Sequence, residues 1–83
     1  MKNYLIIYNY DRFYETYGEC FKAALIRFAD YIGVNCALFE HALIGFDNDD
    51  VYFLIELFNK FFTYSVNVIY EIDRKIYDEE IKR

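Results

Sequence analysis

The sequence contains no proline and no tryptophan, and it has only three glycines, one histidine and one serine among its 83 residues. Disordered chains are rich in proline, serine and glycine, so this composition excludes them. No apolar run approaches the roughly 20 residues that a membrane-spanning helix needs. The run Tyr4–Tyr8 is shorter than the apolar region of a signal peptide and is closed by Asp11 and Arg12. We therefore expect a globular, cytoplasmic protein with no membrane contact.

Residues that commonly hold metals or cofactors are also scarce. His41 is the sole histidine, and Cys20 and Cys36 form no CxxC motif. Zinc sites need three or four protein ligands, and phosphate-binding loops need clustered glycines. The sequence therefore predicts no metal and no cofactor. Both cysteines are expected to be buried free thiols, and a disulfide between them is the alternative.

Positive charge is in the minority, with nine lysines and arginines against fourteen acidic residues and a net charge of −5. Proteins that bind nucleic acid directly draw their affinity from clustered cations, so direct nucleic-acid binding is not expected. An acidic protein is suited to a basic protein partner because complementary charges speed encounter. The alternative is that the charge only keeps the protein in solution.

Aromatic residues, in contrast, are abundant. Hydrophobic residues make up 57% of the chain and include nine phenylalanines and ten tyrosines. This is ample for one core and one domain, spanning residues 1–83. Ten tyrosines exceed the needs of a small core, since each buried hydroxyl requires a partner. Some are therefore candidates for an interface, namely Tyr10, Tyr14, Tyr52 and Tyr77. The alternative is that their rings complete the core while their hydroxyls reach water.

The first half of the chain predicts a strand and then a helix. Residues 2–10 are rich in β-branched and aromatic side chains, which favours an inner strand, and residues 11–15 follow as a loop. Thr16 and Glu19 have the spacing of a capping box. Apolar residues then recur at three- and four-residue steps as far as Gly33, which predicts an amphipathic helix of about 16 residues.

The second half predicts another helix between two strands. Residues 34–46 suit either a strand or a short helix, and we favour the strand because the first strand otherwise lacks a neighbour. Residues 65–72 alternate between apolar and polar and predict a strand. Residues 73–83 mix both charges and form either a short helix or a frayed end.

An acidic stretch, FDNDD, precedes the second amphipathic helix. Asp47 is expected to be its N-cap, with Asp49 in the first turn and Asp50 at the third helical position, where carboxylates meet the positive end of the helix dipole. The stretch is not a calcium-binding loop, because Val51 and Phe58 occupy the fifth and twelfth positions, where such a loop needs oxygen ligands.

These elements predict an α+β or small α/β fold. The expected architecture is a single two-layer domain of about three strands, with two amphipathic helices on one face of the sheet. The order is strand, helix, strand, helix, strand, followed by a short charged C-terminal tail. The second face of the sheet is expected to carry many tyrosine and phenylalanine side chains, covered by the tail or by a second subunit, or else exposed as an aromatic patch.

Two resemblances to known proteins rest on short features. The strand YLIIYNYD, which ends in Asp11, resembles the small CRISPR-associated subunits, and this implies a metal-dependent nuclease-like enzyme or a scaffold dimer. The acidic composition and the final helix and strand resemble barstar, which implies an enzyme inhibitor.

The leading hypothesis is a non-enzymatic protein-binding module that occludes a basic, nucleic-acid-binding surface of a partner enzyme. Small inhibitors encoded by phages and mobile elements, including anti-CRISPR proteins, share this size and charge. The candidate partner-binding residues combine acids with aromatic residues expected to be exposed. They are Tyr10, Asp11, Tyr14, Glu15, Glu19, Asp47, Asp49, Asp50 and Tyr52.

Two alternatives belong to other classes. A homo-oligomeric structural or regulatory subunit of ferredoxin-like type, with a homodimer as its simplest form, follows from a second sheet face that one chain does not cover. A small metal-dependent nuclease-like enzyme is the third hypothesis, with Asp11, Glu40 and His41 as its candidate residues.

Overall fold

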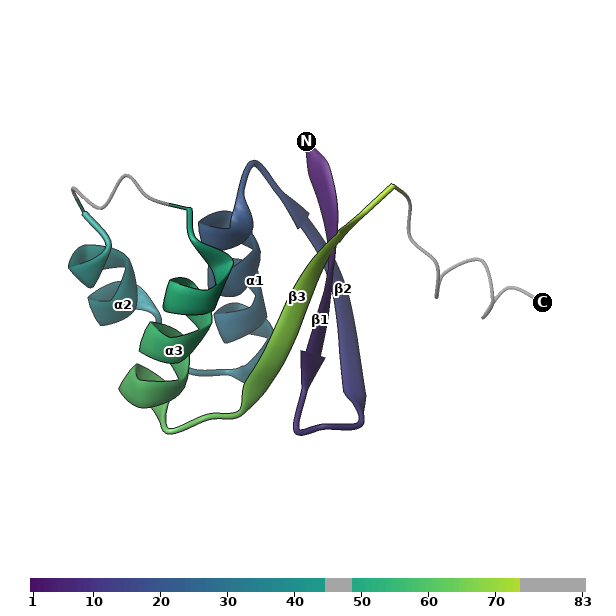
Figure 1. Ribbon diagram of the computed structural model, residues 1–83. Helices are drawn as coiled ribbons and strands as arrows, with labels where there is room; N and C mark the ends of the chain where they lie inside the picture. The colour runs from purple at the N-terminus through teal and green to yellow at the C-terminus, as the bar shows by residue number, and fades with distance from the viewer. Residues whose placement is uncertain (45–48, 74–83) are drawn as a thin grey trace.

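The computed structural model describes residues 1–44 and 49–73. It contains three strands and three helices, in the order β1 (Lys2–Tyr8), β2 (Arg12–Gly18), α1 (Phe21–Ile32), α2 (Ala37–Ala42), α3 (Val51–Phe62) and β3 (Val66–Ile72) (Figure 1). The predicted α+β class is confirmed, with three antiparallel strands in one sheet and two amphipathic helices packed beside it. The predicted C-terminal tail beyond Asp73 lies outside the described residues.

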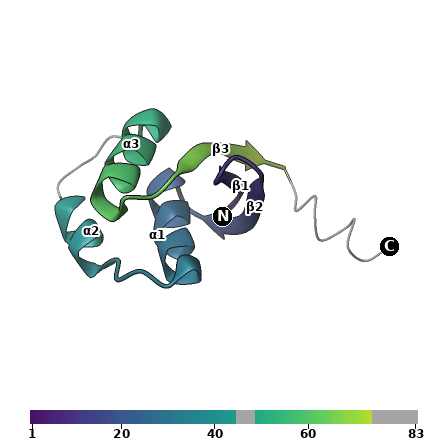
Figure 2. The same ribbon diagram turned by 90° about the horizontal axis from the view of Figure 1, so that it is seen from below.

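The sheet has the strand order β2-β1-β3, and both pairs are antiparallel. The helices α1 and α3 lie together on one face, and α2 lies beyond them, on the side away from the sheet (Figure 2). Both long helices start at the same end of the molecule and run side by side in the same direction (Figure 1). Their carbonyl ends therefore both point towards the hairpin turn between β1 and β2.

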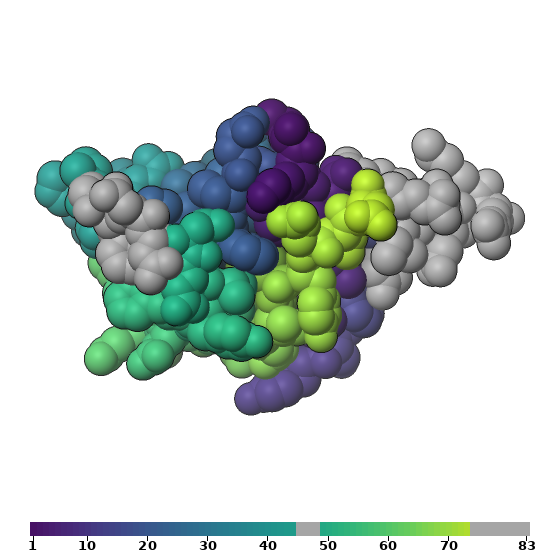
Figure 3. Space-filling model, turned by 45° about the horizontal axis from the view of Figure 1, so that its top comes forward, coloured from purple at the N-terminus to yellow at the C-terminus, as the bar shows by residue number. Residues whose placement is uncertain are grey.

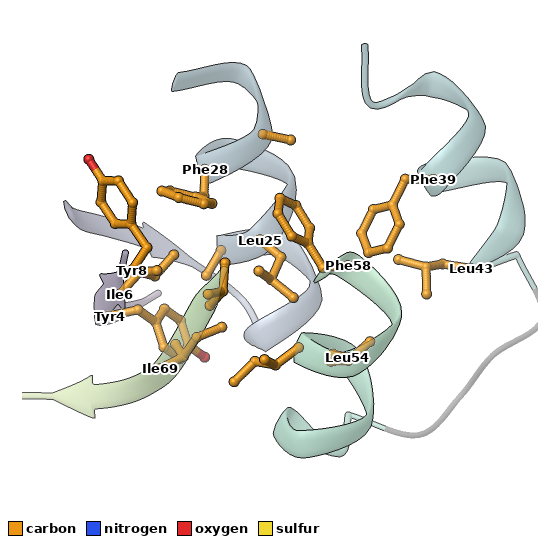
Figure 4. Packing of buried hydrophobic residues seen from close by; sticks show 14 residues of the cluster. Tyr4, Ile6, Tyr8, Leu25, Phe28, Phe39, Leu43, Leu54, Phe58 and Ile69 are labelled. Carbon is orange, nitrogen blue, oxygen red and sulfur yellow. The ribbon is translucent and has the colours of Figure 1, made fainter. Parts of the chain in front are cut away.

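The core lies between the sheet and the two long helices. Side chains of a strand alternate between faces, so Tyr4, Ile6 and Tyr8 of the central strand all point towards the helices and are buried. They meet apolar side chains that recur every three or four residues on the helices (Figure 4). The helical contribution comprises Ala24, Leu25, Phe28 and Ala29 of α1, Phe39 of α2, and Leu54, Ile55 and Phe58 of α3.

The predicted loop at residues 11–15 and the predicted capping box are wrong. Residues 12–18 form β2, in which Thr16 is buried on the helix-facing side, and the first helix starts only at Phe21. Thr16 lies opposite Tyr4 in the register with β1, so its side chain belongs to the sheet. The segment forms a strand and not the start of a helix because its side chains alternate with a period of two and pairing with β1 satisfies its backbone groups.

The predicted strand at residues 34–46 is also wrong. Residues 37–42 form the short helix α2, and residues 45 and 46 lie outside the described part. The neighbour that β1 lacked is supplied by β2, so no strand is needed here. Phe39 and Leu43, four residues apart, are both buried, which is the spacing of one helix face.

Asn59 joins the end of α3 to β3. The sequence places it on the polar side of the helix, but its side chain is half-buried and bonds the backbone of Val66 in both directions. The Val66 amide donates to Asn59 Oδ1 at 2.7 Å, and Asn59 Nδ2 donates to the Val66 carbonyl at 2.9 Å. These two bonds fix where the last strand enters the sheet. None of the helices described is long and apolar enough to cross a membrane.

Tyr4 makes stability depend on pH in the alkaline range. Burial, with the negative charges of Glu71 and Asp49 adding to it, raises the pKa of Tyr4 from 10.0 to about 12. Its contribution to stability is therefore complete below pH 10 and is lost as the pH rises from 10 towards about 12. We expect Tyr4→Phe, which cannot ionise, to unfold at a higher pH than wild type in an alkaline titration followed by circular dichroism. Equal unfolding midpoints would contradict this.

Candidate protein-binding surface

The structure divides the predicted partner-binding residues between the two ends of the molecule. Tyr10 and Asp11 lie in the hairpin turn. Glu19 and Tyr52 lie at the starts of α1 and α3, at the opposite end (Figure 1). The seven residues of β2 separate these ends by about 20 Å. The candidates therefore do not form one continuous surface.

Tyr14 and Glu15 occupy the middle of β2 on opposite faces of the sheet. Tyr14 lies opposite Ile6 and packs against the core, whereas Glu15 lies opposite Leu5 on the face away from the helices. Asp47 lies outside the described residues. Its neighbours Asp49 and Asp50 are described, and both are occupied in helix capping.

Asp50, and not Asp47, is the N-cap of α3. Its Oδ1 accepts the backbone amides of Tyr52 at 3.0 Å and Phe53 at 3.3 Å. The predicted N-cap was placed three residues too early. An aspartate does cap α3, as the sequence predicted, but it is the last acid before the apolar residues of the helix begin.

Asp49 caps the other helix. Its Oδ2 accepts the amide of Phe21 at 3.0 Å and its Oδ1 accepts the amide of Lys22 at 3.2 Å. Cys20, the N-cap residue of α1, makes no side-chain capping bond itself. A carboxylate from a distant part of the chain thus satisfies the first amides of α1 and meets the positive end of its dipole. The predicted position of Asp49, in the first turn of α3, is therefore wrong.

The opposite end carries a tyrosine cluster around Phe28. Phe28 is fully buried, and its ring lies 4.8 Å from that of Tyr8 (Figure 4). It also lies 5.8 Å from the rings of Tyr14 and Tyr64. Tyr31 stacks on Tyr14 with ring centroids 4.1 Å apart. We call Tyr8, Tyr10, Tyr14, Tyr31 and Tyr64, together with the hairpin turn, the tyrosine end.

Two tyrosines of this end, Tyr8 and Tyr31, interact through their hydroxyl groups. Burial, and then a side-chain hydrogen bond with Tyr31, raises the pKa of Tyr8. Tyr31 is nevertheless 55% exposed, so its ring faces solvent on one side. Sequence reasoning found Tyr10 and Tyr14 but missed Tyr31 and Tyr64. Tyr31 could have been found from its spacing. It follows Phe28, the central apolar residue of α1, by three residues, and residues three apart are neighbours on a helix surface.

The hairpin turn holds Tyr10 in an unusual conformation. Asn9 and Tyr10 have positive φ angles of 49° and 66°. The turn is fixed to the start of β3, since the amide of Asn9 donates to the Ser65 carbonyl at 2.8 Å and the amide of Tyr10 donates to Asn67 Oδ1 at 2.7 Å. The side chain of Tyr10 is 84% exposed. The backbone of Tyr10 is therefore strained, and burial of its ring in the core does not offset that cost.

Tyr10→Gly is expected to stabilise the fold by about 1 kcal/mol, because glycine adopts a positive φ without the steric cost of a Cβ atom. Chemical denaturation of the two proteins measures the difference. Tyr10→Ala keeps the Cβ atom and serves as the control, with no gain in stability expected. Destabilisation by glycine would show that the ring of Tyr10 contributes to folding.

The candidate enzymatic residues are not brought together. Asp11 lies in the hairpin turn, whereas Glu40 and His41 lie on α2, on the other side of the long helices from the sheet (Figure 2). In residues 1–44 and 49–73, no group of three or more histidine, cysteine or acidic residues is arranged to hold a metal ion. Cys20 and Cys36 are both free thiols, but each is only partly buried, so the prediction that both are buried is wrong.

Cys36 is held between two carboxylates. Its Sγ lies 3.5 Å from Asp30 Oδ1 and 3.4 Å from Glu40 Oε1, and the two carboxylates share its single proton as acceptors. Burial, together with these hydrogen bonds, raises the pKa of the Cys36 thiol from 9.0 to about 11. Since the thiolate is the nucleophile, Cys36 is expected to react poorly with electrophiles near neutral pH.

In a Cys20→Ser background, alkylation of Cys36 by iodoacetamide at about pH 8 should be roughly tenfold slower than that of an ordinary thiol, because the raised pKa of Cys36 lowers its thiolate fraction more than it increases the nucleophilicity of the thiolate. Glu40→Gln removes one of the two charges and should increase the rate. A rate equal to that of a free cysteine, or one unchanged by Glu40→Gln, would contradict this assignment.

Comparisons with protein-family models, with curated proteins and with solved structures found no match to this chain.

Proposed function

We propose that this protein is a non-catalytic protein-binding module and that the tyrosine end is its contact surface. The observation that carries the proposal is the combination of an exposed tyrosine in a strained turn with a second exposed tyrosine stacked on the core. Strained backbone persists where surrounding structure imposes it, and it is concentrated at functional sites. Tyrosine is also the residue that most often provides interface energy at low conformational cost.

Acidic residues accompany both exposed tyrosines. Asp11 follows Tyr10 in the turn, and Asp30 precedes Tyr31 at the end of α1. All four side chains belong to exposed residues. Exposed tyrosines and exposed carboxylates at the same end suit a surface rich in arginine or lysine, which can form cation–π contacts and ion pairs there. The same ring contact exists within this chain, where the Arg27 guanidinium lies 4.1 Å from the centroid of the Tyr17 ring.

The tyrosine end is suited to binding without rearrangement. Tyr14 and Tyr31 are stacked, and the ring of Phe28 packs against both. Hydrogen bonds to Ser65 and Asn67 fix the turn. A surface that is already ordered loses little conformational entropy when a partner binds. This supports a binding role better than a catalytic one, because catalysis requires positioned acid, base or nucleophilic groups.

The proposed partner is a basic protein surface of the kind that binds nucleic acid. The net charge of −5 favours such a partner and disfavours nucleic acid itself. Occlusion of that surface would make the protein an inhibitor of a nucleic-acid-processing enzyme in the cytoplasm, as phage-encoded and anti-CRISPR inhibitors are. The support for this part of the proposal is charge, size and the tyrosine end together.

The test compares two sets of tyrosine variants. Tyr10→Gly combined with Tyr31→Ala alters the tyrosine end, and Tyr52→Ala, at the opposite end, is the matched control. Each protein is immobilised, incubated with cell lysate and washed at low salt, and the captured proteins are quantified. An arginine-rich peptide, titrated while tyrosine fluorescence is followed, provides a defined probe, and a glutamate-rich peptide of equal length is its control.

We expect wild type and Tyr52→Ala to capture the same nucleic-acid-processing enzyme and to inhibit it, and the double variant to do neither. Added salt should weaken binding. Equal capture by wild type and the double variant would reject the tyrosine end as the contact surface. Capture of an enzyme whose activity is unchanged would reject inhibition, and binding of the acidic peptide in preference to the basic one would reject the charge argument.

A further inference from the structure

The sheet has two outer edges in the part of the chain that the structure describes, one on β2 and one on β3. An outer edge carries backbone N–H and C=O groups that can pair with another strand. Natural proteins protect such edges with charged side chains, bulges or covering segments. The two edges of this sheet differ in these features, and the difference indicates which edge is available to pair with another strand.

The edge of β2 is protected. Arg12 and Glu15 place charges of both signs along it. Tyr17 lies opposite Asn3 and therefore faces away from the helices, yet its ring lies 4.1 Å from the guanidinium of Arg27, a residue of α1 on the other face. This contact has to pass around the outer edge of β2, so the Arg27 side chain covers part of it.

A second copy of the chain would also meet repulsion at β2. An antiparallel pair of β2 strands that used all seven residues would have its two-fold axis at Glu15, the middle residue. The two Glu15 carboxylates would then lie directly opposite each other. Like charges in this position destabilise strand pairing.

Within the described residues, the edge of β3 is protected only by a bulge at Asn67, outside the stretch from Val68 to Ile72. Residues 66–72 contain no lysine, arginine or proline, and their single charge, Glu71, is already paired with Lys2 at 3.5 Å. The strand lies at the surface beside α3 (Figure 3). Val68, Tyr70 and Ile72 alternate along it on the face away from the helices, and Tyr70 is 51% exposed.

The register of a second copy follows from a bulge. Tyr8 pairs with Val66 and Ile7 pairs with Val68, so Asn67 is an extra residue in β3. Regular pairing is available from Val68 to Ile72, and its middle residue is Tyr70. A two-fold axis at Tyr70 places the two tyrosine rings opposite each other and each Val68 opposite an Ile72, which are favourable cross-strand pairs.

We infer that this protein self-associates through β3, two copies pairing antiparallel about Tyr70 to form one six-stranded sheet with the helices of both copies on the same face. The inference does not rest on the proposed function, because the tyrosine end takes no part in it. Five paired residues bury less than the roughly 800 Å² per partner of a standard interface, so we expect a weak dimer with a dissociation constant in the micromolar range.

The first test is sedimentation velocity of the wild-type protein from about 10 to about 500 µM, a range chosen to span weak association. The expected result is a shift from monomer to dimer with rising concentration. Tyr70→Lys places two ammonium groups across the axis and should raise the dissociation constant at least roughly tenfold. Tyr52→Lys adds the same charge on α3 and is the matched control, expected to leave the dissociation constant nearly unchanged.

The second test fixes the register by disulfide formation. In a Cys20→Ser, Cys36→Ser background, Tyr70→Cys should form a disulfide-linked dimer under mild oxidation, since opposite residues in a strand pair bring their Cβ atoms within bonding reach. Glu15→Cys tests pairing through β2 with the charge repulsion removed, and it should remain monomeric because the Arg27 side chain still covers part of that edge. Each variant is first shown to be folded by circular dichroism.

Several results would overturn the inference. These are a folded wild-type protein that stays monomeric at every concentration, a dissociation constant unchanged by Tyr70→Lys, and Glu15→Cys dimers that form as readily as those of Tyr70→Cys. Protection of the outer β3 amides from hydrogen exchange in a monomer would assign the edge to another segment of the same chain. The tyrosine-end variants retain the β3 edge and should dimerise like wild type, so this inference and the proposed function fail separately.

Discussion

Phe28→Ala is expected to lower the free energy of unfolding by about 3–5 kcal/mol. Phe28 is fully buried, and its ring contacts aromatic rings from three directions: Tyr8 of the sheet, Phe58 of α3, and Tyr64 between α3 and β3. Alanine would leave a cavity where all three elements meet. Since domains of this size are stable by only about 5–15 kcal/mol, this one change removes a large part of the total.

Two measurements make the Phe28 prediction specific. Phe28→Leu keeps most of the volume and should cost only about 1 kcal/mol in chemical denaturation. The near-ultraviolet circular dichroism of the tyrosines should weaken in Phe28→Ala even in the folded fraction, because the rings of Tyr14 and Tyr31 lose their support. A loss of stability below about 1 kcal/mol for Phe28→Ala would show that the neighbouring rings close the cavity.

Asp49→Ala is expected to lower the free energy of unfolding by about 2 kcal/mol, more than an exposed N-cap usually contributes. The change leaves the amides of Phe21 and Lys22 without their acceptor at a half-buried site, and it removes the bond between the start of α1 and the segment before α3. Asp50→Ala is the control. It removes a local cap on exposed amides and should cost about 1 kcal/mol.

A rescue experiment separates capping from other effects of Asp49. Cys20 occupies the N-cap position of α1 but makes no capping bond. Cys20→Ser should change the wild type little, because Asp49 already accepts the first amides. In the Asp49→Ala background, the serine hydroxyl can take over one of them and should restore about 0.5–1 kcal/mol. A serine that stabilises both backgrounds equally would show that Asp49 acts otherwise.

Both long helices and the two strands β1 and β3 could be predicted from the sequence, because their apolar residues follow the period of the element. The buried residues of α1 and α3 include those expected from three- and four-residue spacing, such as Leu25, Phe28 and Phe58. Their position on one face of the sheet was predicted from the two-layer architecture and not from periodicity.

The strand β2 could not be predicted because its turn lacks the usual residues. Hairpin turns with positive φ are normally marked by glycine or by an Asn-Gly pair, whereas this turn uses Asn9 and Tyr10. Thr16 and Glu19 then gave a capping pattern that the structure does not use. With β2 unrecognised, the missing neighbour of β1 was sought in residues 34–46, so one omission produced both errors.

The capping role of Asp49 was beyond local reasoning for a different reason. Rules for helix ends consider residues within one turn, and by those rules Asp49 belongs to the helix that follows it. Its partners, Phe21 and Lys22, are 28 and 27 positions away. Such a contact exists only because α1 and α3 start side by side, which is a property of the tertiary fold. The candidate surface was only partly predicted for the same reason. Tyr31 and Tyr64 are far from the hairpin turn in the sequence and come near it only in the folded protein.

The parallel course of α1 and α3 brings their carbonyl ends together at one end of the molecule (Figure 1). Peptide dipoles in each helix sum to about half a negative charge at its carbonyl end, and two parallel helices place these partial charges together. Asp49 and Asp50 neutralise the positive ends, and the last turn of α1 carries no basic residue, although that of α3 carries Lys60. At the tyrosine end these partial charges add to the exposed carboxylates of Asp11 and Asp30, so the local potential there favours an approaching cation.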